Sequence, residues 1–221
     1  MSTTDKSTSI DLEEIRNIIA LEAEAISNIP VNNKYSKAVD IIVEQVHNKN
    51  GKLVVSGMGK AGQIGQNIAT TFCSTGTPAI FLHPSEAQHG DLGILQSNDV
   101  LLMISNSGKT REIIELLDLS RNMYADIPII VITGNEDKDS ILANEAHVSL
   151  FTGHPDEVCP LKLTPTTSIT VMTVIGDLLV IETMRRIGFN EQEYAKRHHG
   201  GYLGSVSRSR SRTFDCAGEK Q

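Results

Sequence analysis

The chain has 221 residues, of which 39% are hydrophobic, and a formal net charge of −7 at pH 7. This length can bury one α/β core but is short for two full domains, and the acidic balance argues against non-specific nucleic-acid binding. The polar start, three cysteines without metal or disulfide spacing, and apolar runs shorter than the roughly 20 residues of a membrane span predict a cytoplasmic protein with no membrane segment.

The apolar residues change their spacing along the chain in a regular way. Helical spacing predicts helices over residues 11–26 and 36–46. Five β-like runs follow at residues 52–56, 78–82, 100–104, 128–133 and 147–151, and helices are predicted over residues 63–72, 112–120 and 137–143. Alternating apolar strands and helices predict a parallel five-stranded sheet covered on both faces, which is a three-layer αβα sandwich.

A long helix is predicted over residues 167–187, and it is apolar on much of its circumference. Such a helix is buried in the domain or packed in a subunit interface. We expect one domain over residues 1–204, with its core at about 51–204. Residues 205–221, which include an SRSRSR repeat, are predicted to form an unstructured tail.

The segment SNSGKTRE at residues 105–112 lies between an apolar strand and a predicted helix. Ser105, Asn106, Ser107 and Thr110 offer polar side chains, Gly108 permits close backbone approach, and the first helical N–H groups point at the same place. An ordinary helix N-cap needs only one such side chain. The segment therefore predicts a phosphate-binding loop at residues 105–110, called the serine loop below.

The sequence after the first strand, at residues 57–62, reads GMGKAG and is a literal G-x-G-x-x-G. This motif in this context is typical of dinucleotide binding, which would want an acidic residue about 20 positions further on. Glu86 is only a rough candidate for that residue, and Lys60 places a cation inside the turn. We favour Lys60 facing a ligand that the serine loop binds.

Other polar segments follow the remaining strands. His83 and His89 lie six residues apart in a loop without cysteines, which is a poor zinc signature, and contacts to a sugar or a structural role fit better. Glu157 precedes the long helix, and His198 and His199 precede paired glycines near the end of the predicted fold.

Together these segments resemble a known family over residues 51–204. VVSGMGKAG, STGTPAIFLHPSEAQHGDLG, ISNSGKTREI, CPLKLTPTTS and HHGGYLG resemble the motifs of sugar isomerase (SIS) domains, and specifically of arabinose 5-phosphate isomerases of the lipopolysaccharide pathway. The resemblance implies the SIS fold, usually a tetramer, and interconversion of D-ribulose 5-phosphate and D-arabinose 5-phosphate for Kdo or capsule synthesis. The family's essential residues carry over to Lys60, Glu112, Glu157 and His198, and its substrate-contacting residues to Gly76, Thr77, His83 and His89.

Aldose–ketose isomerisation through an enediolate needs a base, a group that stabilises an oxyanion, and a grip on the phosphate. Neither a metal nor a redox cofactor is needed. We assign phosphate binding to Ser56 and the serine loop, and oxyanion stabilisation to Lys60. Glu112 or Glu157 would be the base, and His198 would assist ring opening or relay protons. The alternative for either glutamate is a structural ion pair, such as Glu112 with Lys60.

Three features depart from the family pattern. Lys109 stands where the family usually has an acidic residue, and His199 stands where it has proline, which leaves open which histidine acts. The common long form continues into a pair of cystathionine-β-synthase-like domains, so regulation is expected to differ. A different phosphosugar, a non-catalytic sugar-phosphate sensor and a dinucleotide-dependent oxidoreductase stay open as alternatives.

Overall fold

The computed structural model describes residues 10–200, 202 and 204–207. Its centre is a five-stranded parallel sheet in the order β2-β1-β3-β4-β5. The strands are β1 (Leu53–Gly57), β2 (Ala79–Phe81), β3 (Val100–Ile104), β4 (Ile129–Thr133) and β5 (Val148–Phe151). β1, β3 and β4 are buried throughout and continuously apolar but for Ser56, Gly57 and Thr133, as expected of strands covered on both faces.

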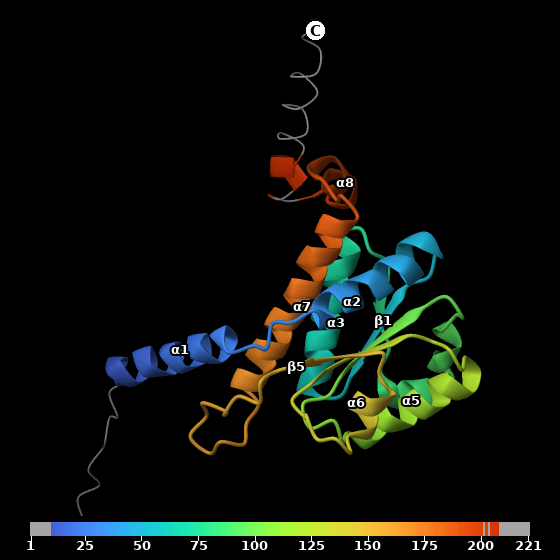
Figure 1. Cartoon of the computed structure of the whole chain (residues 1–221). Coiled ribbons are helices and arrows are strands. Elements are labelled where there is room, and N and C mark those ends of the chain that lie inside the picture. Colours follow the sequence, from blue (N-terminus) through green and yellow to red (C-terminus); the bar gives the residue numbers. More distant parts are fainter. Residues whose placement is uncertain (1–9, 201, 203, 208–221) are drawn as a thin grey trace, which may run out of the picture.

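Helices cover both faces of this sheet, and two apolar clusters separate the layers. One cluster joins alternate strand residues to α2 (Lys34–Ile42), α3 (Lys60–Ser74) and α7 (Thr167–Arg186). The other joins the intervening strand residues to α4 (Pro84–Ala87), α5 (Arg111–Met123) and α6 (Ile141–Glu145). The predicted αβα sandwich is confirmed (Figure 1).

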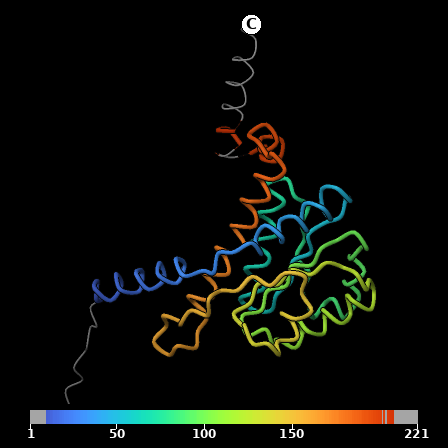
Figure 2. Tube along the Cα trace, in the orientation of Figure 1, coloured from blue at the N-terminus to red at the C-terminus, as the bar shows by residue number. Residues whose placement is uncertain are grey.

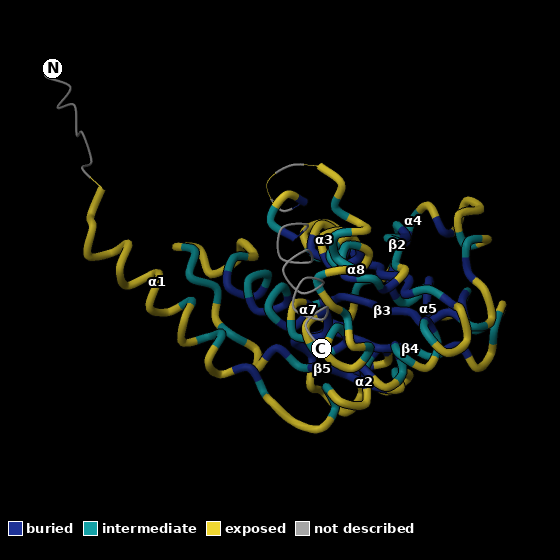
Figure 3. The backbone as a smooth tube through the Cα atoms, turned by 90° about the horizontal axis from the view of Figure 1, so that it is seen from above, coloured by how far each residue is buried: buried dark blue, intermediate teal, exposed yellow. Residues whose placement is uncertain are grey.

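The first helix, α1 (Leu12–Ser27), extends away from this body (Figures 1 and 2). None of its residues is buried, and Figure 3 shows most of it exposed, with residues of intermediate exposure only towards its end, where Ala25 and Ile26 pack against the domain. The exposed side chains include an apolar set: Leu12, Ile15, Ile18, Ile19 and Leu21. The apolar stripe of an amphipathic helix normally packs against other apolar side chains, and most of the stripe of α1 has no such contact within the described chain.

Several predicted boundaries are wrong for local reasons. α6 begins at Ile141 rather than residue 137, because Asn135 closes a turn by accepting from the Asp137 N–H, and Ser140 caps the helix through the Ala143 N–H. α3 begins at Lys60, three residues before the predicted start at residue 63. The helix predicted over residues 36–46 is α2 followed by a π-helical turn, Val43–Asn48. Neither α4 nor α8 (Glu191–Arg197) was predicted.

Two further expectations need correction or lie outside the described residues. α7 is long and apolar enough to cross a membrane by length and composition alone, contrary to the expectation that no such segment exists. Half of its most apolar stretch is buried inside the domain, as is usual for a core helix. Residues 204–207, partly within the predicted tail, are helical, and the tail residues 208–221 lie outside the described part.

Candidate active site

The sheet order brings two polar loops together. β1 lies between β2 and β3, so the chain order reverses there, and ligands of such sheets bind beyond the carboxyl ends of the strands at this point. Gly57 pairs with Ile104 at the ends of β1 and β3. The turn that leads to Lys60 and the serine loop that begins at Ser105 therefore leave the sheet side by side.

Glycines allow α3 to start directly after β1. A Cβ on Gly62 would lie 2.6 Å from the Gly57 carbonyl oxygen, so only glycine permits this approach. Lys60 is the first residue of α3 and is exposed. Among the ion pairs of the described residues, none includes Lys60 or Glu112, so the alternative of a structural pair between them is not supported.

The serine loop is held in shape by its own side chains. Ser105 is 2% exposed, and its hydroxyl lies 2.8 Å from the hydroxyl of Thr110, the N-cap residue of α5. Ser107 is exposed and accepts a hydrogen bond from the Lys109 N–H at 3.2 Å. Gly108 has φ 62°, a left-handed conformation that suits glycine. The hydroxyl proton of Ser107 is thereby left available beside the first N–H groups of α5, which have no intrahelical partner.

A cavity of about 500 Å³ opens beside this loop. Its polar lining comes from the ends of β3, β4 and β5: Asn106, Ser107, Lys109, Gly134, Asn135, Glu136, Asp137 and His154. The Asn106 side-chain oxygen is buried and has no hydrogen-bond partner among the described residues. A buried unpartnered amide is costly unless a ligand or water satisfies it.

The two candidate glutamates differ in their surroundings. Glu112 lies in the first turn of α5 and is half-buried. Glu157 lies in the loop before α7, where one carboxylate oxygen accepts from Thr166 N at 2.6 Å, Thr166 Oγ1 at 3.0 Å and Ser168 N at 3.4 Å. Burial alone would raise the pKa of Glu157, but hydrogen bonds from Ser168 and Thr166 outweigh it, so this pKa lies below its ordinary value.

Ser56 and His83 lie deeper than expected. Ser56 is fully buried and donates its hydroxyl proton to the Leu82 carbonyl at 2.7 Å, so that proton is not available to a phosphate. His83 is half-buried, and its Nδ1 has no hydrogen-bond partner in the described part. His89 is exposed beyond α4. The described residues contain no group of three histidine, cysteine or acidic side chains placed to hold a metal ion.

Three of the predicted site residues lie at the opposite end of the sheet. Gly76 and Thr77 follow α3, whose 15 residues separate them by roughly 22 Å from Lys60 at its start. Thr77 is 1% exposed, and its hydroxyl lies 3.1 Å from Nε2 of His47. His198 ends α8, which packs near Gly76 and lies at the far end of α7 from the loop that holds Glu157 (Figure 1). Within one chain, the predicted set is therefore divided in two.

His154 lines the cavity beside the serine loop, and the sequence did not indicate it. It has a left-handed conformation with φ 54°, rare for a residue other than glycine, and its Nδ1 lies 3.0 Å from the Gly134 carbonyl oxygen. Its sequence context, TGHPD, resembles an ordinary loop. Only its position after the last strand could have drawn attention to it.

Comparison with known proteins places these features in a family. The model of the SIS domain matches residues 45–182. Arabinose 5-phosphate isomerase KdsD of Francisella tularensis is 44% identical over 83% of this chain. A solved protein of Bacteroides fragilis, described as a phosphosugar isomerase involved in capsule formation, is 66% identical with TM-score 0.84, and the match covers 86% of this chain and 98% of that one.

A more distant solved structure contains a ligand. Protein c3406 of E. coli CFT073, solved in complex with arabinose 5-phosphate, is 30% identical with TM-score 0.77, and the match covers 90% of this chain and all of that one. The chain spans only 55% of the length of the Francisella protein.

Proposed function

The chain belongs to the SIS domain family, and on that premise we propose that it is an aldose–ketose isomerase that interconverts D-ribulose 5-phosphate and D-arabinose 5-phosphate. The observation that carries the proposal is the serine loop at the start of α5, next to Lys60 at the switch point of the sheet. The relatives named as arabinose 5-phosphate isomerase, and the E. coli protein solved with that sugar phosphate bound, support this substrate. Its product would supply Kdo for lipopolysaccharide or a capsule.

In this proposal the phosphate binds to Ser107, Thr110 and the N–H groups at the start of α5. Hydrogen bonds to a charged phosphate contribute about 1.5–3 kcal/mol each, more than the roughly 0.3–1 kcal/mol of the helix dipole. Ser105 orients Thr110 through their hydroxyl contact. The Asn106 amide contacts the sugar, which satisfies its otherwise unpartnered oxygen through a substrate hydroxyl.

Lys60 stabilises the oxyanion that develops as the proton moves between carbons one and two. We assign the base to Glu112 rather than Glu157. Hydrogen bonds hold Glu157 in its ionised form and lower its pKa, and a carboxylate with a lowered pKa is a weaker base. Glu157 instead fastens its loop to the start of α7.

A homotetramer completes the site in this proposal. Gly76, Thr77 and His198 lie too far from Lys60 to share a substrate within one chain, so a neighbouring subunit provides them. The uncovered apolar stripe of α1 indicates a surface that another subunit covers. Light scattering at micromolar concentration is expected to show a tetramer, and a stable monomer would contradict this arrangement.

The proposed enzyme acts in the cytoplasm and needs no redox cofactor, because the isomerisation leaves the overall oxidation state of the sugar unchanged. The purified protein is expected to convert ribulose 5-phosphate to arabinose 5-phosphate in a coupled assay without added metal or nucleotide, and to keep full activity after chelation. Loss of activity that zinc restores would assign a metal to His83 and His89. No conversion under any of these conditions would reject the isomerase.

A further inference from the structure

His198 is held in a stack of aromatic rings at the end of α8. Its imidazole lies parallel to the ring of Tyr194, with 3.7 Å between ring centroids and 11° between planes. Phe189 meets Tyr194 edge-on, at 6.4 Å and 74°. A Cβ on Gly76 would lie 2.7 Å from the Phe189 ring, so Phe189 packs directly on the backbone of Gly76. The contacts therefore run from the body of the domain through two rings to His198.

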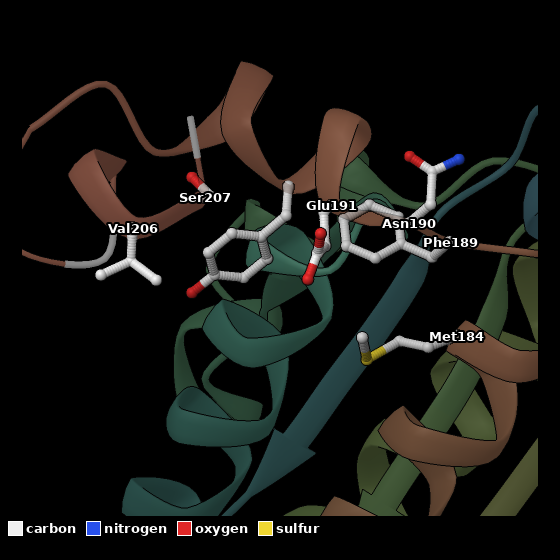
Figure 4. A pocket seen from close by; sticks show the side chains of 7 residues that line it. Met184, Phe189, Asn190, Glu191, Val206 and Ser207 are labelled. Carbon is white, nitrogen blue, oxygen red and sulfur yellow. The ribbon is translucent and has the colours of Figure 1, made fainter. Parts of the chain in front are cut away.

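Phe189 and Tyr194 also line a cavity of about 300 Å³, with Met184 of α7 among its other walls (Figure 4). Figure 4 shows Phe189 beside Glu191, and both side chains line this cavity.

The backbone determines which nitrogen of His198 carries a proton. Nδ1 lies 3.0 Å from the carbonyl oxygen of Tyr194, and a carbonyl oxygen only accepts hydrogen bonds. Nδ1 therefore donates, and in neutral His198 Nε2 is the unprotonated nitrogen that can accept a proton from a sugar hydroxyl. The parallel Tyr194 ring fixes the plane in which Nε2 points.

We infer that the ring of Tyr194 is a positioning group: it holds the His198 imidazole in the plane in which Nδ1 reaches the backbone carbonyl of Tyr194, and without the ring the imidazole turns away and loses both this orientation and the tautomer preference that proton relay needs. The inference rests on the proposed function, in which His198 contacts the substrate. Tyr194 acts through its ring, and its hydroxyl is not required. Loss of this orientation is expected to lower kcat while KM changes little, because a misplaced proton-transfer group affects the transition state more than it affects substrate binding.

The test compares Tyr194→Phe, Tyr194→Ala and Tyr194→Leu in the full chain, with Tyr124→Ala at the end of α5 as the control for loss of a distant aromatic ring. Tyr194→Phe is expected to keep wild-type kinetics. Tyr194→Ala is expected to lower kcat by about tenfold or more with little change in KM. Tyr194→Leu preserves bulk on α8 and replaces the alanine variant if that variant does not fold. NMR of ¹⁵N-histidine-labelled protein reads the tautomer of His198, whose signals His198→Asn identifies.

A Tyr194→Ala or Tyr194→Leu enzyme with wild-type kcat would overturn the inference, and so would a loss of turnover without a change in the His198 tautomer. The same series separates this failure from failure of the proposed function. If His198→Asn turns over like the wild type, His198 has no role in the reaction. If the wild type does not act on ribulose 5-phosphate, the NMR comparison still decides whether Tyr194 fixes the imidazole.

Discussion

Replacing each candidate glutamate with glutamine tests which one removes the proton. Glutamine preserves shape and removes the charge. Glu112→Gln is expected to lower kcat by about 10²–10⁴, the usual contribution of a general base. It is expected to cost little stability, because the described structure shows no ion pair or side-chain hydrogen bond to the Glu112 carboxylate.

Glu157→Gln is expected to show the opposite balance. Its carboxylate oxygen accepts two short hydrogen bonds, at 2.6 and 3.0 Å, from Thr166. Charge-assisted bonds contribute about 1.5–3 kcal/mol and neutral ones about 0.5–1.5 kcal/mol, so losing the charge costs roughly 1 kcal/mol per bond, or about 2 kcal/mol in unfolding free energy. Any loss of turnover would follow from a loosened start of α7 and would be smaller than that of Glu112→Gln.

The assay is turnover in heavy water with detection of deuterium on carbon one of the ketose or carbon two of the aldose. Glu112→Gln should lose this exchange in step with turnover. Glu115→Gln, one turn further along α5 and paired with Arg111, is the matched control and should exchange like the wild type. Exchange lost only in Glu157→Gln would refute the assignment, and exchange kept in both variants would make His198 the base to test.

Three further predictions concern binding and stability. Ser107→Ala should raise KM about tenfold or more with kcat less affected, because it removes one phosphate contact present in both ground and transition states; an unchanged KM in steady-state kinetics would place the phosphate elsewhere. Asp99→Ala should lower the free energy of unfolding in urea by about 3–5 kcal/mol, since the Asp99 carboxylate is fully buried and lies 2.7 Å from the Lys52 ammonium; a loss below about 1 kcal/mol would contradict this. Burial lowers the pKa of His47, so the unfolded chain binds the proton first. The contribution of neutral His47 to the free energy of unfolding is therefore fully present above about pH 6.5 and is lost as the pH falls through the pKa of His47 in the folded chain. His47→Gln should reduce this decline in the free energy of unfolding.

The sequence predicted the sheet accurately, because β1, β3 and β4 are buried throughout and the apolar runs of the strands have clear ends. The strand at residues 100–104 matches β3 residue for residue. Short elements were missed for the opposite reason. α8 has seven residues, none of them buried, and its start depends on one cap, in which the Asn190 side chain accepts the Glu193 N–H. Such a helix has no apolar period to detect.

Part of the arrangement around the candidate site could be expected from the sequence. Alternating strands and helices predict a parallel sheet, so Lys60 and the serine loop were expected at the same edge of it; that they are adjacent follows from the observed strand order. The engagement of Ser56 with the Leu82 carbonyl and the strained backbone of His154 depend on tertiary contacts that have no local pattern. The distance of His198 from Lys60 could not be foreseen either, because motifs show residue types and not the end of the sheet on which they lie.

This division of residues leads to a test in mixed oligomers. If each site takes Lys60 and Glu112 from one subunit and His198 from another, Lys60→Ala and His198→Asn chains are each inactive alone but complementary. In random assembly of equal amounts, each of the two subunits that form a site has an even chance of being the variant that carries the native residue needed there. About one quarter of the sites should therefore hold both native residues. Unfolding and refolding the two variants together should therefore recover about a quarter of wild-type turnover, whereas refolding each alone should recover none. Two tagged forms of the chain verify that mixed oligomers have formed. Mixed oligomers without recovered activity would mean that the two residues serve the same chain, or that the site does not use His198.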